Sequence, residues 1–277
     1  MRRSLLHQRR PVPNDFFKGL MFTTAELLPD LLFNTLADGI LNVIAFHRTK
    51  GFNVSLVLTD GKFKAIRGVI HDEGKADLNT SAPNEHVPEV ERNIRIIKGR
   101  VRSTLHGMPY RKIPRKMKAE LVLTIVTLLN MVSRKASISD RYSPRELVTG
   151  VRTEYNKHLK TSSEKYCLVH DDKTSTKTMA ARATRAIAIG PDSNSQGSYK
   201  FYLLDTGSIV TRRNWDEMVV TPEIIQKVEE MAKNEDDMEV QFEYHGTILR
   251  DEEAPNPEDN DTTGADDTHE NDDDHNT

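Results

Sequence analysis

NEHVPEVERNIRIIKGRVRS, residues 84–103, is the segment that decides the fold. Its composition changes from acidic to strongly basic within a few residues, and its apolar side chains recur at helical spacing. Val90, Ile94, Ile97 and Val101 stand at positions i, i+4, i+7 and i+11, which predicts one buried stripe on an α-helix. Pro88 suits the first turn of that helix, because its missing N–H would have no partner there.

A second row of this helix is charged. It lies one residue further on, about 100° around the helix, and consists of Glu91, Arg95, Lys98 and Arg102. The wider segment 89–120 holds ten Lys and Arg against three Glu. This density favours a nucleic-acid track. A basic stripe is more often a solvated face, and both interpretations stay open at this point.

The charge of the chain is divided unevenly. Twelve of its 42 acidic residues lie in 251–277, which has no Lys or Arg, so the first 250 residues hold 30 acidic and 39 basic residues, a net of +9. A basic body with an acidic tail is common among polyanion-binding proteins. A charged disordered tail that serves solubility is an equal alternative, and the composition of 251–277 predicts disorder.

The 277-residue chain has room for two modest domains. No apolar run is long enough for a membrane span, and the basic start MRRSLLHQRR is too poor in apolar residues for a signal peptide. The single cysteine, Cys167, excludes an internal disulfide and a multi-cysteine zinc site. We therefore expect an intracellular protein without a membrane partner.

The first half of the chain alternates strand and helix patterns. Residues 20–28 and 53–61 and, more weakly, 76–83 are typical of strands. Helical spacing marks 31–52, with Gly51 as its C-terminal cap, and 116–132; SPREL, residues 143–147, predicts a short helix capped by Ser143. This order favours an α/β sheet.

The second half has a different texture. After a polar stretch at 154–165, interpreted as a linker, short strand-like runs at 165–172, 185–191, 197–204 and 208–215 are separated by turn residues, with a hairpin turn at Asp205-Thr206-Gly207. Such runs suggest a small barrel. A helix is predicted at 221–234, with Thr221 as its cap and Ile225, Val228 and Met231 as its apolar edge.

Two carboxylates are candidates for metal-assisted phosphoryl transfer. This chemistry requires acidic side chains that hold two divalent ions, for which the hard cations Mg²⁺ and Mn²⁺ are suited. Asp60 ends the predicted strand 53–61, and Glu91 lies in the first turns of the basic helix. The simpler alternatives are an ordinary Asp-Gly turn for Asp60 and a surface ion pair with Arg95 for Glu91.

Several motifs resemble one family, in the same order along the chain. LVLTDGKFKAIRG, NEHVPEVERNIRIIKGRVR, KIPRKMKAELV, SPRELVTG and NSQGSYKFYLLDTGSIVTRRNW are similar to the integrase region of copia-type retrotransposon polyproteins. The resemblance covers residues 16–230. It implies a ribonuclease-H-like core at 16–155 and an SH3-like β-barrel at 156–220. The sequence pattern adds a helix and extension at 221–250 and, because residues 1–15 have no period, disorder at that end as well as at 251–277.

The resemblance also implies a reaction. Such integrases use three acidic residues and two Mg²⁺ ions for 3′-end processing and for strand transfer of transposon ends into target DNA. Asp60 matches the second acid and Glu91 the third, so both become predicted catalytic and metal-binding residues. The predicted DNA contacts are Arg92, Arg95, Lys98, Arg102, Arg111 and Lys112. A homo-oligomer is a further expectation, as is a nuclear location for a functional integrase and a cytoplasmic one otherwise.

The first acid of the family has no match here. Asp15 falls where the strand after it should lie, so we expect the chain to begin after the first strand of the core. The loss of one metal ligand predicts little or no strand transfer by this chain alone. The alternatives are therefore an integrase-type enzyme with impaired activity, a non-catalytic nucleic-acid-binding module, and an inactive transposon remnant.

Overall fold

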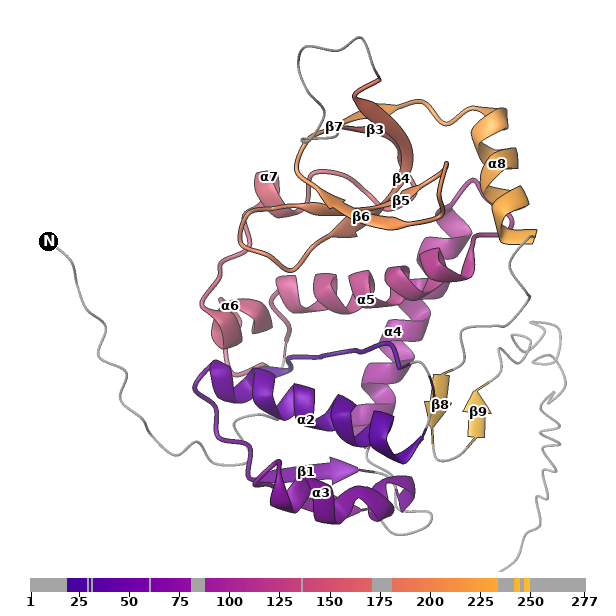
Figure 1. Ribbon diagram of the computed structural model, residues 1–277. Helices are drawn as coiled ribbons and strands as arrows, with labels where there is room; N and C mark the ends of the chain where they lie inside the picture. The colour runs from indigo at the N-terminus through magenta and orange to yellow at the C-terminus, as the bar shows by residue number, and fades with distance from the viewer. Residues whose placement is uncertain are drawn as a thin grey trace, which may run out of the picture. The chain divides into compact units, whose positions relative to one another are not determined.

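The computed structural model describes residues 19–28, 30, 32–59, 61–80, 88–135, 137–170, 181–233, 242–244 and 247–249. For residues 62, 88–91, 242–244 and 247–249 it describes the backbone alone. The chain is a mixed α/β protein, as the sequence predicts at that level (Figure 1). Residues 1–240 form one unit and residues 241–277 a second, which contains the hairpin β8 (Phe242–Tyr244) and β9 (Thr247–Leu249). The predicted disorder at 1–15 and 251–277 lies outside the described residues.

The first long helix is α2 (Phe33–Thr49), which confirms the helix expected within 31–52. Gly51 follows its end with a φ of +87°, a left-handed conformation that glycine adopts without a steric penalty, and its N–H donates to Arg48 O. The cap expected at Gly51 is therefore present.

A parallel strand pair follows. β1 (Leu56–Thr59) pairs with β2 (Asp77–Thr80), and Thr59 is registered against Thr80. The connection between them passes through a 3₁₀ turn, η1 (Gly61–Ile66), and the short helix α3 (Arg67–Asp72). Both strands were predicted within 53–61 and 76–83. Their inward side chains join α2 and α3 in one apolar cluster of buried residues: Ala37, Ile44, Ile66, Ile70, Ala76 and Leu78.

The strand predicted at 20–28 is wrong. Residues 21–28 belong to no helix or strand, and no strand in the described part of the chain pairs with them. The backbone N–H and C=O of Thr23 are instead both bound by the side chain of Asn130. An amide side chain thus satisfies the groups that a neighbouring strand would otherwise pair.

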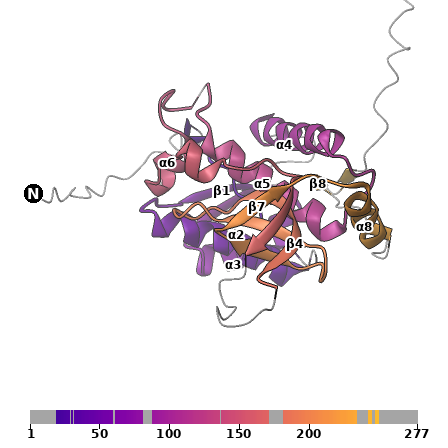
Figure 2. The ribbon, with the colours of Figure 1, turned by 90° about the horizontal axis from the view of Figure 1, so that it is seen from above.

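Two long helices follow the strand pair. α4 (Pro88–Gly107) contains the segment that opened the sequence analysis, and α5 (Arg115–Met131) matches the helix expected at 116–132. The two pack against each other, and α5 also packs along β4 of the next sheet (Figures 1 and 2). Because it is covered from several directions, α5 buries eight residues: Met117, Leu121, Val122, Thr124, Ile125, Val126, Asn130 and Met131.

The chain between the helices and the second sheet was predicted partly right. α6 (Pro144–Thr149) begins as expected, with the Ser143 hydroxyl accepting from the Glu146 N–H at 3.2 Å. The polar stretch 154–165, however, is more than a linker. It forms α7 (Tyr155–His158), and His158 is only 1% exposed. Its ring Nδ1 accepts from the Glu154 N–H at 3.0 Å, and burial lowers its pKa, so the neutral ring is favoured.

The second sheet is antiparallel and has five strands. They are β3 (Tyr166–His170), β4 (Ala183–Pro191), β5 (Tyr199–Leu203), β6 (Ile209–Arg212) and β7 (Trp215–Met218). Their order across the sheet is β6-β5-β4-β3-β7. β6 and β7 lie at opposite edges although only residues 213–214 separate them in the chain. The sheet must therefore curl strongly for its edge strands to be joined by so short a link. The predicted run 208–215 thus spans β6 and the first residue of β7.

Both faces of β4 are buried. Ala186 and Ala188 belong to the inner core of the sheet, with Cys167, Tyr199 and Phe201. Ile187 and Ile189 alternate with them and are also buried. At the end of the strand, Gly190 has a φ of +154°, and a Cβ atom there would lie 2.2 Å from Thr124 Cγ2 of α5. Only glycine allows the sheet and α5 to approach this closely.

The helix predicted at 221–234 is α8 (Pro222–Lys233). Its buried residues are Ile224 and Val228, one turn apart. Val228 of the predicted edge is therefore confirmed, whereas Ile224 is buried in place of Ile225, and Ile225 and Met231 are only half-buried.

None of the helices in the described part of the chain has the length and apolarity that a bilayer crossing requires. This agrees with the absence of a long apolar run in the sequence.

Replacement of Gly190 by alanine tests the contact between α5 and β4. We expect Gly190→Ala to lower the free energy of unfolding by about 2–4 kcal/mol, through backbone strain and the clash with Thr124. Thr124→Ser, which removes Cγ2, should recover part of that loss. The control is Gly68→Ala on α3, where a Cβ meets nothing within 4 Å and stability should stay equal or rise. Urea unfolding of Gly190→Ala, Thr124→Ser, the double variant and Gly68→Ala measures the effect. If Gly190→Ala lowers the free energy of unfolding equally in the wild-type and the Thr124→Ser background, the contact is contradicted.

Candidate nucleic-acid interface

The basic row of α4 is exposed along most of its length. Arg92, Arg95 and Arg102 are exposed and Lys98 is half-buried. The opposite face is held by Ile97, which is 9% exposed. At a rise of 1.5 Å per residue, Arg92 and Arg102 are about 15 Å apart along the helix axis, about the length of four phosphates of one DNA strand. The described part of α4 therefore presents a line of cations at the scale of a nucleic-acid backbone.

Arg111 and Lys112 lie apart from the basic row of α4. Both are exposed but lie beyond the end of α4, in the turn that leads to α5. The backbone N–H of Arg111 donates to Glu229 Oε1 of α8 at 2.9 Å. An acidic side chain thus lies beside this end of the surface and weakens its attraction for a polyanion.

The structure describes the two predicted catalytic acids only in part. Asp60 lies outside the described residues, and of Glu91 only the backbone is described, in the first turns of α4. Their neighbours nevertheless locate the region. Thr59 and Thr80, the last residues of β1 and β2, are partners in the parallel pair, so the carboxyl ends of both strands lie at one edge. Gly61 continues from the first strand, and α4 begins eight residues after the second.

A polar network fixes the N-terminal part of α4. Asn93 Nδ2 donates to Thr23 Oγ1 at 2.9 Å. Asn130 Nδ2 donates to Thr23 O at 2.6 Å, and Asn130 Oδ1 accepts from the Thr23 N–H at 2.9 Å. Arg134 Nη1 donates to Asn93 Oδ1 at 3.3 Å. Residues far apart in sequence thus hold α4, α5 and the segment 21–28 together.

Arg134 is the least satisfied member of this network. Its Nη2 is buried and has no hydrogen-bond partner. Burial lowers the pKa of its guanidinium, as expected when a charge leaves water. The sequence pattern did not single out Asn93, Asn130 or Arg134, because single polar residues, on the helices α4 and α5 or just after α5, carry no periodic signal.

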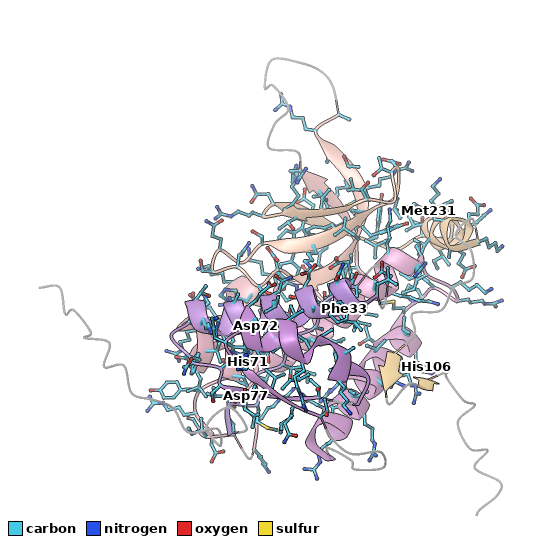
Figure 3. The ribbon with its side chains drawn as sticks, turned by 60° about the horizontal axis from the view of Figure 1, so that its bottom comes forward. Phe33, His71, Asp72, Asp77, His106 and Met231 are labelled. Atoms are coloured by element: carbon cyan, nitrogen blue, oxygen red, sulfur yellow. The ribbon has the colours of Figure 1, made fainter. Side chains whose placement is uncertain are left out.

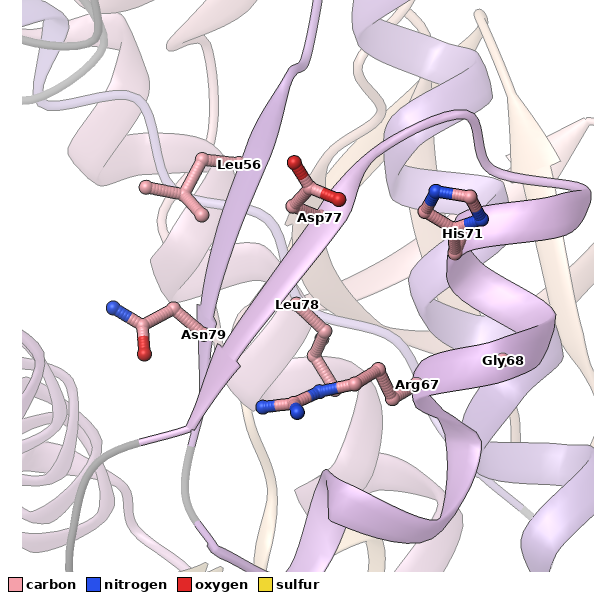
Figure 4. Close-up of a pocket in the computed structure, with 7 residues that line it drawn as sticks. All are labelled: Leu56, Arg67, Gly68, His71, Asp77, Leu78 and Asn79. Atoms are coloured by element: carbon pink, nitrogen blue, oxygen red, sulfur yellow. The ribbon is translucent and has the colours of Figure 1, made fainter.

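A surface groove of about 650 Å³ lies beside the parallel strand pair (Figure 4). β1 and β2 contribute Leu56, Asp77, Leu78 and Asn79, and α3 contributes Arg67, Gly68 and His71. His71 Nδ1 is 3.2 Å from Asp72 Oδ1 on the exposed surface of α3, and Figure 3 shows His71, Asp72 and Asp77 in the same part of the molecule. Among the described side chains, the groove combines a guanidinium, an imidazole and a carboxylate.

The expected metal site stays a prediction. Among the described residues, no three or more His, Cys, Asp or Glu side chains come together in a way that could hold a metal ion. Asp60 and the side chain of Glu91 are not among those residues. Cys167 is no alternative nucleophile, because burial raises the pKa of its thiol to about 12.

No protein-family model matches the sequence, and a comparison with curated proteins gives no significant match.

Replacement of Asn130 tests the network that positions α4. Asn130→Leu keeps the volume but leaves both backbone groups of Thr23 without their partner, and should lower the free energy of unfolding by about 1–3 kcal/mol. The same change at the exposed Asn53 should cost less than about 0.5 kcal/mol. Hydrogen exchange gives the local measurement: the Thr23 amide should exchange faster in Asn130→Leu. An unchanged exchange rate would contradict the clamp.

Proposed function

We propose that the chain is an integrase-type nucleic-acid-binding protein related to copia-type retrotransposon polyproteins. In this proposal residues 16–155 are part of a ribonuclease-H-like core and residues 156–220 an SH3-like barrel. The complete form would catalyse Mg²⁺-dependent 3′-end processing and strand transfer, with Asp60 and Glu91 as metal ligands. DNA is the partner: transposon ends and target DNA.

One observation carries the proposal. The parallel strands β1 and β2 are joined through α3 and followed by α4, so the chain leaves both strands at the same edge of the pair. Asp60 directly follows the first strand, and Glu91 lies in the first turns of the helix that follows the second. In open α/β sheets, ligands bind outside the carboxyl ends of the strands. This order supports a shared site for the two carboxylates.

The second sheet supports the other half of the proposal. Its order, β6-β5-β4-β3-β7, places the first strand beside the last and leaves a two-residue link between the edge strands. This is the arrangement that a small five-stranded barrel requires. The inner face is filled by Tyr199, Phe201 and small residues of β3 and β4, which gives such a barrel its core.

DNA binding is assigned to α4. Arg92 and Arg95 are exposed at its N-terminal half, near Glu91 in sequence. Cations beside a metal-binding carboxylate would hold the phosphate backbone where the ions act.

The proposal includes weak catalysis. No residue of this sequence matches the family's first acid, and two carboxylates supply less charge and less geometric constraint to a metal pair than three. A non-catalytic nucleic-acid-binding module is therefore the second candidate. It is favoured by the exposure of the α4 cations, which bind phosphate without any metal.

The salt dependence of DNA binding tests the role of α4. Arg92→Gln combined with Arg95→Gln should reduce the magnitude of the slope of log K against log salt by about 2, one unit for each lost phosphate contact. Affinity for a labelled 20-base-pair duplex should fall about tenfold at 0.1 M salt. The control combines Arg141→Gln with Arg152→Gln, two exposed arginines flanking α6, and should keep the wild-type slope. Equal slopes for the two double variants would remove α4 from the interface.

Metal-dependent nicking of a transposon-end duplex tests catalysis. With Mn²⁺, the wild-type chain should give slow cleavage near the 3′ end that Asp60→Asn or Glu91→Gln abolishes, while duplex affinity stays within about twofold. The exposed Asp77, changed to Asn, is the matched control and should cleave like the wild type. If the wild type neither nicks nor joins the duplex, the non-catalytic module is the better account.

A further inference from the structure

The only tryptophan of the chain, Trp215, is held rigidly at the edge of the five-stranded sheet. One side of its ring packs on Tyr199 and Phe201, at centroid distances of 4.8 and 5.2 Å. Its indole N–H donates to Thr161 Oγ1 at 3.0 Å, and that hydroxyl donates to Glu217 Oε1 at 2.7 Å. The ring is half-buried and fixed in orientation from the side of the core.

The ring also borders a pocket of about 510 Å³ at the surface. Lys160, Thr161, His170 and Arg213 line this pocket together with residues 214–217 of the β7 edge. Lys160 Nζ stands 5.2 Å from the centre of the indole ring, the geometry of a cation–π contact. The pocket therefore presents an aromatic side chain together with cations.

The acidic groups of this pocket are already engaged. Asp216 Oδ2 lies 2.9 Å from His170 Nε2, and Glu217 accepts from Thr161. Lys160 and Arg213 are exposed. The pocket thus offers two exposed cations, Lys160 and Arg213, beside two carboxylates that already have hydrogen-bond partners within the protein.

We propose that this pocket, the Trp215 pocket, binds an unpaired nucleobase of single-stranded nucleic acid. The base stacks on Trp215, and Lys160 and Arg213 take the flanking phosphates. Lys160 has a long flexible side chain, so it can leave the ring for a phosphate when the base enters. This site goes beyond the proposed duplex-binding function, does not depend on it, and lies on a different element from α4.

A proline-rich peptide is the other ligand that an aromatic pocket could take. Peptide grooves of that kind use several exposed aromatic rings, whereas here Tyr199 and Phe201 are fully buried beneath Trp215. One accessible ring with two cations fits one base and its phosphates better, since every base offers a flat face for stacking and each nucleotide brings a negative charge.

Because the chain has a single tryptophan, its fluorescence reports on this pocket directly. Titration of the full chain with a twelve-nucleotide oligothymidylate should quench the emission by about half. An abasic oligomer of the same length and charge should bind about tenfold more weakly and cause little quenching, because only stacking is lost. Oligouridylate in a parallel titration separates RNA from DNA as the preferred source of the base.

Variants complete the test. Arg213→Gln should weaken oligothymidylate binding several-fold and leave the quenching at saturation unchanged. Trp215→Phe should keep part of the affinity and Trp215→Leu lose about tenfold, measured with a labelled oligomer. Tyr142→Leu, at a ring that is 43% exposed elsewhere, is the control and should bind normally. Circular dichroism shows whether the Trp215 variants fold, and the Arg213 variant still tests the site if they do not.

The outcomes separate this site from the function of α4. Equal binding of the thymidylate and abasic oligomers without quenching would overturn the Trp215 pocket, and so would quenching by a proline-rich peptide alone. Either result leaves duplex binding by α4 intact. Conversely, Arg92→Gln with Arg95→Gln should leave the quenching unchanged, so loss of the α4 function leaves the Trp215 pocket standing.

Discussion

The approach of α5 to β4 is the constraint on which the rest of unit 1–240 depends. Thr124 of the helix lies so close to Gly190 that no Cβ fits between them. Nearby, Lys200 Nζ of β5 and Glu120 Oε2 of α5 form an ion pair of 2.7 Å, and both side chains are mostly shielded from solvent. One helix thus joins the α/β part of the chain to the antiparallel sheet. Because α5 buries the polar Thr124 where it meets the sheet, it differs from an ordinary amphipathic helix, whose buried face is apolar.

The far end of the same helix positions α4. Asn130 lies in the last turn of α5, and its amide holds Thr23, whose hydroxyl in turn accepts from Asn93 of α4. The orientation of the basic row therefore depends on hydrogen bonds rather than on the apolar stripe alone. An apolar contact permits a helix to slide or rotate by small amounts, whereas directed hydrogen bonds at one end fix its rotation.

The sequence predicted elements well where one period dominates. α2, α4, α5 and four of the five strands of the second sheet follow from apolar spacing and turn residues, whereas β7 was not predicted as a separate strand. The cap at Ser143 follows from its chemistry. Failures occurred where tertiary hydrogen bonds replace a periodic pattern. Residues 20–28 have strand propensity, but the backbone of Thr23 is bound by the side chain of Asn130 instead of a strand. The polar run 154–165 contains the buried His158. On α8 the error was one position, because Ile224 and Ile225 are equally apolar and only packing chooses between them.

The sequence predicted the candidate site to about the same extent as the fold. Helical spacing indicates which cations of α4 share a face, and their exposure agrees with it. The network around Arg134 was not predictable, because its members come from 23, 93, 130 and 134 and meet only in the fold. Trp215 could be noticed as the single tryptophan, but its role depends on Lys160 and Thr161, which precede it by more than fifty residues.

Binding and catalysis place different demands on this chain. Residues 52–59, FNVSLVLT, contain no charge and no proline, although β2 is the one strand that pairs with β1 among the described residues. Exposed edges in native sheets are usually protected by charge, proline or a bulge. Asp77 N donates to Ser55 O, so the backbone groups of Ser55 point toward β2. Successive residues of a strand point their N–H and C=O groups to opposite sides, so those of Leu56 and Leu58 point away from β2. Within the described part of the chain, the strand that precedes Asp60 pairs with β2 alone, and two-metal chemistry tolerates little movement of its ligands. The ring of Trp215 is held instead by Tyr199, Phe201 and Thr161, contacts that do not involve β1, so binding at this ring does not depend on the strand that supports Asp60.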